Sequence, residues 1–137
     1  MTAIVDTGFA YALAQPDDDE HIIARLFYLE SLEALILPVP ALTELSLLAH
    51  RDGGNFTAIS MIQAIQHSRM IVTDLNSEDY DRAVEILVKY SDTRIDFVDT
   101  CVMALAERLK IARVLTFDRR DFGIYRPSHV KQFELLP

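Results

Sequence analysis

Four acidic residues lie close to the ends of apolar runs in this chain. Asp6 directly follows Ile4-Val5, Asp118 directly follows residues 114–117, and Glu44 comes a few residues after the run 35–39. Asp99 begins an apolar helical pattern before the run that leads to Asp118. Carboxylates gathered in a partly buried cleft are costly unless a cation neutralises them. Because Mg²⁺ and Mn²⁺ suit a site built from oxygen ligands, these acids point to a divalent metal centre if they meet.

Each acid taken alone also has a purely structural explanation. Asp6 can end a strand through an Asx-turn, Glu44 can favour a helix N-terminus, and Asp118 can cap a short turn. Asp96 and Asp99 have the spacing of a capping box, so Asp96 is mainly a candidate cap that lies near the site. These separate explanations become less convincing for the four acids taken together, because all four are expected at the same edge of one sheet.

For the acids to meet, the runs that precede them must be neighbouring strands. Short apolar runs bounded by turn residues predict strands at residues 2–5, 35–39, 70–72, 113–117 and 133–136. Helical patterns lie between them, at residues 9–14, after 17–20, from Pro40, at 55–67 beyond a break at Gly53-Gly54, from Ser77 and at 96–109.

Several of these helices carry apolar stripes. In the helix from Ser77 we expect the stripe to face inward. In chain order, the four stripes at helical spacing are Ile22, Leu26, Leu29 and Leu32; Leu42, Leu45 and Leu48; Tyr80, Ala83, Val84 and Leu87; and Val98, Val102, Leu105 and Leu109. Strands that alternate with helices predict an α/β fold with a mostly parallel sheet covered on both faces. In such sheets ligands bind beyond the carboxyl ends of the strands, where the four acids are expected.

Length and composition set limits on the class of protein. The chain has 137 residues and half of them are hydrophobic, which predicts one folded domain over residues 1–137. A single cysteine excludes an internal disulfide framework and a multi-cysteine zinc site. Because we find no signal-peptide pattern and no apolar run long enough for a membrane span, we expect a cytoplasmic protein without a membrane partner.

Charge is unevenly distributed along the chain. The net charge is −8, but residues 1–100 carry a net of −11 and residues 101–137 a net of +3. The overall sign argues against a protein that coats nucleic acid electrostatically. The basic C-terminal part can still present a local positive surface to an anion, although a chance fluctuation on solvated faces explains it equally well.

Four motifs in order resemble the PIN domain, and most of all the VapC-like toxin ribonucleases of bacterial toxin–antitoxin pairs. They are Ile4-Val5-Asp6-Thr7, Pro40-Ala41-Leu42-Thr43-Glu44-Leu45, the segment 96–107 (DFVDTCVMALAE) and the segment 115–122 (LTFDRRDF). Each motif alone is weak, but their order and spacing match over essentially the whole chain. The resemblance implies a single-domain three-layer α/β/α sandwich and a metal-dependent ribonuclease that acts on single-stranded RNA.

The resemblance also assigns roles to residues. It places the catalytic acids at Asp6, Glu44, Asp99 and Asp118, with Asp6 and Asp99 as the main ligands of Mg²⁺ or Mn²⁺. Thr100 departs from the alanine that is common at that place in the family, whereas Thr7 and Thr116 stand where small hydroxyl residues are common. The expected reaction is hydrolysis that leaves 5′-phosphate and 3′-hydroxyl ends.

Substrate and protein partners complete the expectation. Basic side chains near the cleft would grip phosphate, and the candidates are Arg94, Arg119 and Arg120, with Arg126 and Lys131 as further ones. A toxin of this kind implies a cognate antitoxin protein. A homodimer is also expected, with the apolar helices of residues 22–48 as its interface.

Two other functions compete with this interpretation. A phosphatase of the haloacid-dehalogenase type needs a second acid two residues after the first, and Asp6-Thr7-Gly8 lacks it. A non-catalytic α/β interaction module, whose acidic residues serve only as helix caps, remains the alternative.

Overall fold

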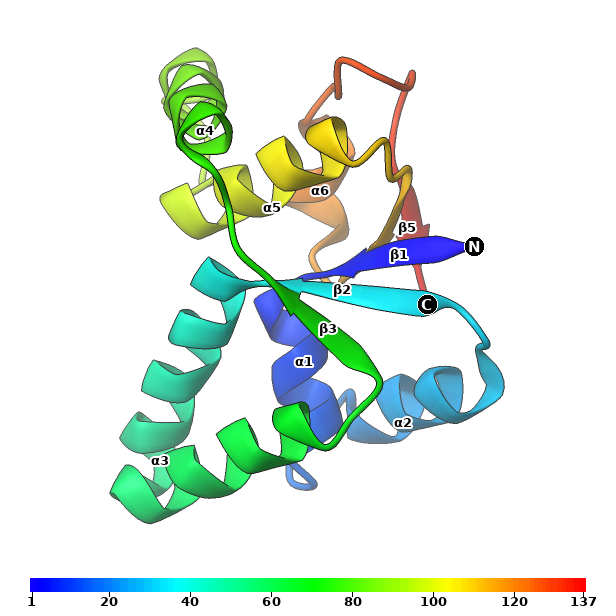
Figure 1. Ribbon diagram of the computed structural model, residues 1–137, viewed down its shortest axis with the longest axis vertical. Helices are drawn as coiled ribbons and strands as arrows, with labels where there is room; N and C mark the ends of the chain where they lie inside the picture. The colour runs from blue at the N-terminus through cyan, green and yellow to red at the C-terminus, as the bar shows by residue number, and fades with distance from the viewer.

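The computed structural model describes all residues 1–137 as an α/β fold with a five-stranded sheet (Figure 1). Its elements in chain order are β1 (Thr2–Val5), α1 (Thr7–Ala14), α2 (His21–Glu30), β2 (Ala34–Pro38), α3 (Val39–Gln66), β3 (Met70–Thr73), α4 (Ser77–Lys89), α5 (Phe97–Arg108), β4 (Arg113–Leu115), α6 (Arg119–Ile124) and β5 (Glu134–Leu136). The strands lie in the order β3-β2-β1-β4-β5, and every neighbouring pair is parallel.

Two apolar layers cover the sheet because successive strand residues point to opposite faces. On one face Ala3 and Val5 pack in a cluster with residues of α1, α2 and α3. On the other face Ile4 and Val114 pack with residues of α4, α5 and α6. Figure 1 shows these two groups of helices on opposite sides of the strands. The predicted α/β/α sandwich with a parallel sheet is therefore confirmed.

The predicted break at the two glycines is confirmed. The element α3 extends to Gln66, but Gly53 and Gly54 have non-helical backbone dihedrals, so α3 consists of two helical segments that meet at a kink. Gly54 has φ of +74°, a conformation that glycine adopts without the steric penalty of a Cβ atom.

Two of the expected apolar stripes lie partly outside the core, although Ala83 of α4 is buried as predicted. Tyr80 and Val84 were expected inside, yet they are 39% and 52% exposed. α4 packs on α5 through Ala83 and Ile86, which are buried, so the face of Tyr80 and Val84 is rotated away by one residue, or 100°. Likewise on α2, Ile22, Leu26 and Leu29 are exposed, and only Ala24 is buried.

The helices are also limited in length and hydropathy. None combines the length and the apolar character that crossing a lipid bilayer requires.

Candidate active site

Asp6 lies at the carboxyl end of the central strand β1 and is almost fully buried. It is the N-cap of α1, where its Oδ1 accepts a hydrogen bond from the Thr7 backbone N–H at 2.8 Å. The pKa of Asp6 is raised to about 7, mainly by burial and to a smaller extent by the charges of Asp118 and Glu44, against the lowering effect of its hydrogen bonds. An ionised Asp6 is therefore unfavourable unless positive charge compensates it.

The neighbouring strand β4 brings Asp118 to the same edge. The Thr116 hydroxyl, fully buried, donates to Asp6 Oδ2 at 2.9 Å and accepts from the Asp118 N–H at 2.9 Å. Asp118 caps α6, and its Oδ1 accepts from the Asp121 N–H at 2.9 Å. Thr116 thus links the two strand ends through one hydroxyl group, which agrees with its expected place at the site.

Asp99 reaches the site from the first turn of α5. It forms the expected capping box with Asp96: the Asp99 N–H donates to Asp96 Oδ1 at 2.9 Å, and the Asp96 N–H donates to Asp99 Oδ2 at 3.0 Å. Burial raises the pKa of Asp99 to about 8, with smaller contributions from the charges of Asp96 and Asp6. Asp99 takes part in the capping box and also lies close enough to Asp6 for their charges to interact. Capping alone therefore does not account for its position.

Glu44 projects from the second turn of α3, which follows β2. Burial raises the pKa of its half-buried carboxyl, and the charge of Asp96 adds to the effect. The Thr7 hydroxyl lies near enough to lower this pKa slightly, but it makes no hydrogen bond of ordinary geometry and is a buried oxygen without a partner. A further ligand bound among these carboxylates would give the buried Thr7 hydroxyl the hydrogen-bond partner that it lacks.

The four acids therefore lie in one neighbourhood. Asp6 is close enough to Glu44, Asp99 and Asp118 for their charges to repel. In Figure 1 the N-terminal ends of α1, α3 and α5 meet at the carboxyl edge of the sheet, on the left of the view. No three acidic, histidine or cysteine side chains are close enough together to enclose a metal ion as they stand. The donor set is all oxygen and carries excess negative charge, so its chemistry fits a hard divalent cation.

One acid near the site was missed in the sequence. Asp121 is buried, its Oδ1 has no hydrogen-bond partner, and burial together with the charge of Asp118 raises its pKa. The repeated spacing Asp-x-x-Asp, at 96–99 and again at 118–121, was the available signal.

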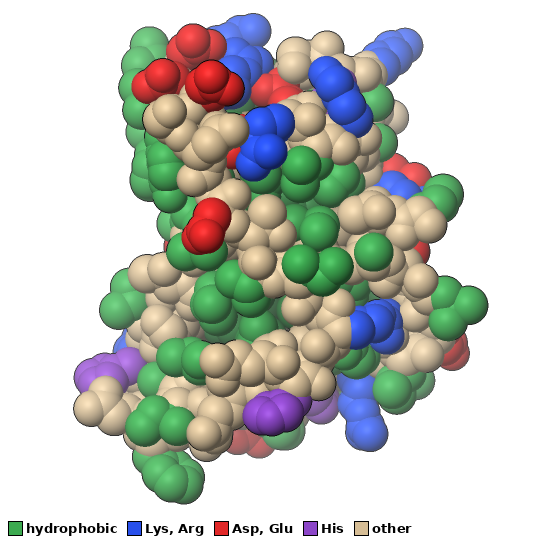
Figure 2. Space-filling view, viewed as in Figure 1, with side chains coloured by type: hydrophobic (Ala, Val, Ile, Leu, Met, Phe, Trp, Pro, Cys, Tyr) green, Lys and Arg blue, Asp and Glu red, His purple; other side chains and the backbone are tan.

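Two of the expected basic residues border this group of acids. Arg94 and Arg120 are exposed and close enough to Asp121 for their charges to lower its pKa. Arg119 is exposed as well, and its Nη2 donates to the Pro137 carbonyl. Figure 2 shows charged side chains gathered mostly on the upper part of this face, and an outline that narrows on the left between that part and α3.

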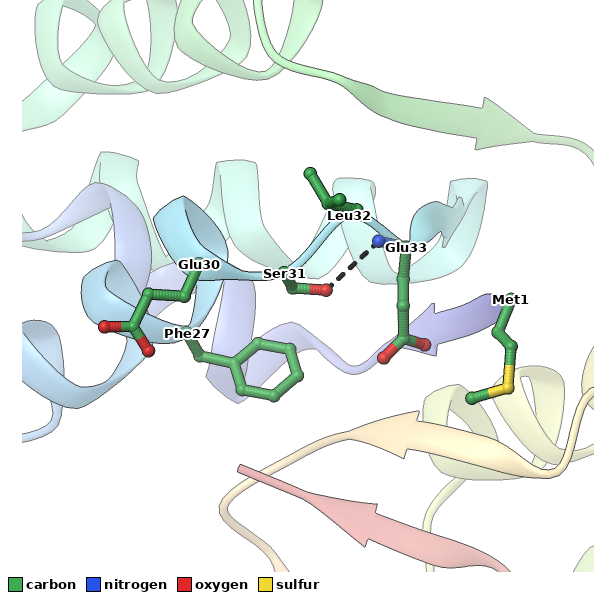
Figure 3. A pocket seen from close by; sticks show the side chains of 6 residues that line it. All are labelled: Met1, Phe27, Glu30, Ser31, Leu32 and Glu33. Atoms are coloured by element: carbon green, nitrogen blue, oxygen red, sulfur yellow. Dashed lines mark hydrogen bonds between the residues drawn. The ribbon is translucent and has the colours of Figure 1, made fainter.

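Prominent hollows of the surface lie elsewhere. One is lined by Met1, Phe27 and residues 30–33, where the Glu33 N–H donates to the Ser31 hydroxyl at 3.1 Å (Figure 3). Met1 leads into β1, so this hollow lies at the amino end of the sheet, opposite to the acids. It is therefore separate from the candidate active site.

Comparison with known families identifies the arrangement. The model of the PIN domain family matches residues 3–126, which is most of the chain. The chain belongs to the PIN domain family. The matched residues include every acid of the candidate site, β2, β3, β4 and all of β1 but its first residue.

Known relatives of this PIN domain are similar along their whole length. Ribonuclease VapC26 of Mycobacterium tuberculosis is 25% identical over 134 residues, which cover 98% of this chain and 99% of the relative. Among solved structures, the Mycobacterium tuberculosis toxin VapC20, which cleaves the sarcin–ricin loop, has a TM-score of 0.83 at 23% identity, with 95% and 99% of the two chains covered. VapBC2 of Rickettsia felis, bound to a promoter DNA fragment, has a TM-score of 0.72 at 14% identity and full coverage of both chains.

Proposed function

We propose that this protein is a metal-dependent endoribonuclease that cleaves single-stranded RNA and acts as the toxin of a toxin–antitoxin pair. The observation that carries the proposal is the gathering of Asp6, Glu44, Asp99 and Asp118 at one sheet edge, with their negative charges uncompensated by any cationic side chain in direct contact. The PIN domain match and the similarity to Ribonuclease VapC26 support it.

In this proposal Asp6 and Asp99 hold the cation, Mg²⁺ or Mn²⁺, and Glu44 and Asp118 complete the pocket. The bound cation supplies a Lewis acid that draws electron density from the scissile phosphate. Thr116 holds Asp6 in place through its hydroxyl, and the capping box holds Asp99. These supports fix two carboxylates whose repulsion would otherwise drive them apart.

Glu44 and Asp118 have the remaining roles at the reacting atoms. One of them orients a water molecule and accepts its proton as the water oxygen bonds to phosphorus. The bond from phosphorus to the 3′-oxygen breaks, and that oxygen takes a proton from solvent and leaves as a 3′-hydroxyl, while the carboxylate returns its proton to solvent. The phosphate stays on the 5′ side of the next nucleotide.

Arg94, Arg119 and Arg120 are the proposed phosphate-binding residues. Arg94 and Arg120 lie at the Asp121 side of the acids, where a polyanion that enters the site meets positive charge first. Guanidinium groups pair well with phosphate oxygens, and the acids repel RNA until a cation occupies them.

The protein partners follow from the same relatives. We propose a cognate antitoxin that blocks the site, and a homodimer whose interface includes α2 and the first half of α3. The exposed apolar residues of these two helices support this assignment: they are Ile22, Ile23, Leu26, Leu29 and Leu47. Apolar side chains grouped on a surface favour a protein partner.

The alternative, a non-catalytic module, has one observation in its favour. Asp6 and Asp118 are helix N-caps, and Asp99 is the partner of the N-cap Asp96 in a capping box. Capping, however, needs only hydrogen bonding to backbone N–H groups. It gives no reason for Asp6, Asp99 and Asp118 to lie together with Glu44, where their charges repel.

The test is RNA cleavage by the purified chain. We expect single-stranded RNA to be cut with Mg²⁺ or Mn²⁺ present, to be left intact in EDTA, and to carry new 5′-phosphate ends. Asp6→Asn should abolish cleavage, and Asp17→Asn, which changes an exposed acid in the loop before α2, should leave it unchanged. Equal cleavage by the wild-type and Asp6→Asn proteins would refute the proposal.

A further inference from the structure

Two aromatic rings lie open to solvent beside the candidate active site. Tyr80 of α4 and Phe97 of α5 stack with ring centroids 6.3 Å apart and an angle of 16° between their planes. They are 39% and 43% exposed, whereas Phe9, Phe122 and Tyr125 are buried. At this separation near-parallel rings are offset, so part of each ring face stays uncovered.

The ring pair lies next to the acids in sequence and in space. Phe97 is the first residue of α5, directly after Asp96 and two residues before Asp99. Tyr80 lies near the beginning of α4, in the turn capped by Asn76 after the carboxyl end of β3. Both rings therefore stand at the edge of the sheet that carries the acids.

A cation completes the set. Arg94 is exposed, precedes Phe97 by three residues, and acts electrostatically on Asp121. Within residues 94–99 the chain thus presents a guanidinium, an exposed ring and the half-buried carboxylate of Asp99. In an RNA strand, a guanidinium can bind the phosphate, an aromatic ring can stack on the base, and a carboxylate can act at the scissile bond.

We propose that Tyr80 and Phe97 form a stacking platform for a nucleobase that flanks the scissile phosphate of single-stranded RNA. This inference rests on the proposed ribonuclease function. Unpaired bases are held in proteins mainly by stacking on aromatic side chains, and the stacking tolerates any base because every base has a flat face. The platform would hold the strand while Arg94 contacts its backbone.

A protein partner is the competing occupant of this surface. Val84 and Val88 extend the exposed apolar strip of α4 beyond Tyr80. The immediate surroundings of Phe97 favour RNA instead, because Arg94 supplies a cation three residues away and Asp99, a proposed metal ligand, lies two residues away. The strip and the ring pair make different predictions, which the tests below separate.

The first test compares kinetics of matched variants. Phe97→Leu keeps apolar volume but removes the ring, and we expect about a tenfold rise in KM with little change in kcat. Phe97→Tyr keeps the ring and should have the wild-type KM. Phe56→Leu, at an exposed phenylalanine of α3 beyond the bend, is the control and should change neither constant. A wild-type KM in Phe97→Leu would overturn the platform and leave the ribonuclease function standing.

The second test measures stacking without cleavage. In the Asp6→Asn background, a single-stranded RNA that contains 2-aminopurine should lose fluorescence on binding, and the further change Phe97→Leu should restore it. Unquenched 2-aminopurine in the Asp6→Asn protein would overturn the platform even if the wild-type protein cleaves no RNA. A changed molecular mass of Phe97→Leu in light scattering, with quenching unaltered, would assign the rings to a protein interface and also refute the proposal.

Discussion

Asp6, Asp99 and Asp118 each take part in capping a helix, Asp99 as the capping-box partner of Asp96, while facing other negative charges. The caps use Oδ1 of Asp6, Oδ2 of Asp99 and Oδ1 of Asp118. At Asp99 and Asp118 the other carboxylate oxygen has no protein partner among the hydrogen bonds of the site, and it is free to bind a cation. Local helix chemistry therefore orients each acid, and the sheet edge brings the acids together.

Replacing Asp99 by asparagine separates charge from hydrogen bonding. The amide oxygen of Asp99→Asn can still accept from the Asp96 N–H, so the capping box is kept in part while one repelling charge is removed. We expect the metal-free variant at pH 8 to be more stable by roughly 1–3 kcal/mol in urea denaturation, and to have lost Mn²⁺ binding by calorimetry. Retained Mn²⁺ binding would remove Asp99 from the proposed ligands.

The raised pKa values of Asp6, about 7, and Asp99, about 8, set a pH dependence for the metal-free protein. Between pH 5 and 8 the folded state holds protons that the unfolded state has already lost, so unfolding releases them. Stability should therefore fall as pH rises through this window, by roughly 5 kcal/mol.

Denaturation in EDTA at pH 5, 6.5 and 8 measures this loss. With Mn²⁺ present the trend should weaken or reverse, because the cation binds the ionised carboxylates. The double variant Asp6→Asn/Asp99→Asn is the control and should show a much flatter profile. A wild-type stability that rises from pH 5 to 8 without metal would contradict the assignment.

At the scale of elements, the sequence predicts whether a segment is a helix or a strand better than it predicts which face of a helix is buried. Alternating apolar runs and helical patterns led to all five strands and to the capping box at Asp96, because these depend on local chemistry. Which face of α4 is buried depends on the angle at which it meets α5, and the pattern around Tyr80 and Val84 was misassigned by one residue. Asp121 was missed because its burial results from the packing of α6.

The carboxylate of Glu107 joins α5 to α4 through an ion pair and to the segment after α6 through a hydrogen bond. Glu107 is buried and accepts from Arg82 Nε at 2.7 Å and from the Ser128 N–H at 2.6 Å. Burial alone would raise the pKa of Glu107, but these hydrogen bonds outweigh it and lower the pKa to about 2. The stabilisation is present above the ordinary pKa near 4.5 and is lost as pH falls toward 2.

Glu107→Gln should therefore destabilise the fold by roughly 2–4 kcal/mol, since it leaves Arg82 without its buried partner. Glu85→Gln, at the exposed carboxylate that binds the same Arg82, is the matched control and should cost less than about 0.5 kcal/mol. Urea denaturation at pH 7 measures both variants. Equal losses would show that burial of Glu107 does not matter.

The bend in α3 makes a second prediction at this scale. Gly54→Ala places a Cβ in a conformation that only glycine adopts readily, and we expect a loss of about 1–3 kcal/mol. Gly123→Ala in α6 meets no atom within 4 Å and should be neutral or slightly stabilising. Thermal unfolding compares the two. An unchanged stability of Gly54→Ala would mean that the bend is not required.

At the scale of the whole molecule, charge opposes the proposed function. A protein with net charge −8 repels RNA at long range, so binding must depend on a few cations beside the acids. The net charge of +3 in residues 101–137 fits this requirement, because it includes Arg119 and Arg120 at the start of α6. Their effect is local, over about one Debye length.

This charge distribution predicts a weak salt dependence with an identifiable origin. If Arg94, Arg119 and Arg120 each neutralise one phosphate, the logarithm of kcat/KM at low substrate should fall with the logarithm of salt concentration with a slope of about −2. Arg120→Gln should lower kcat/KM and make the slope shallower by about 0.7, because one fewer counterion is released. Arg25→Gln, at an exposed arginine of α2 and with the same change of net charge, should leave the slope unaltered. Equal slopes for Arg120→Gln and Arg25→Gln would mean that RNA senses the net charge of the molecule rather than the cations beside the acids.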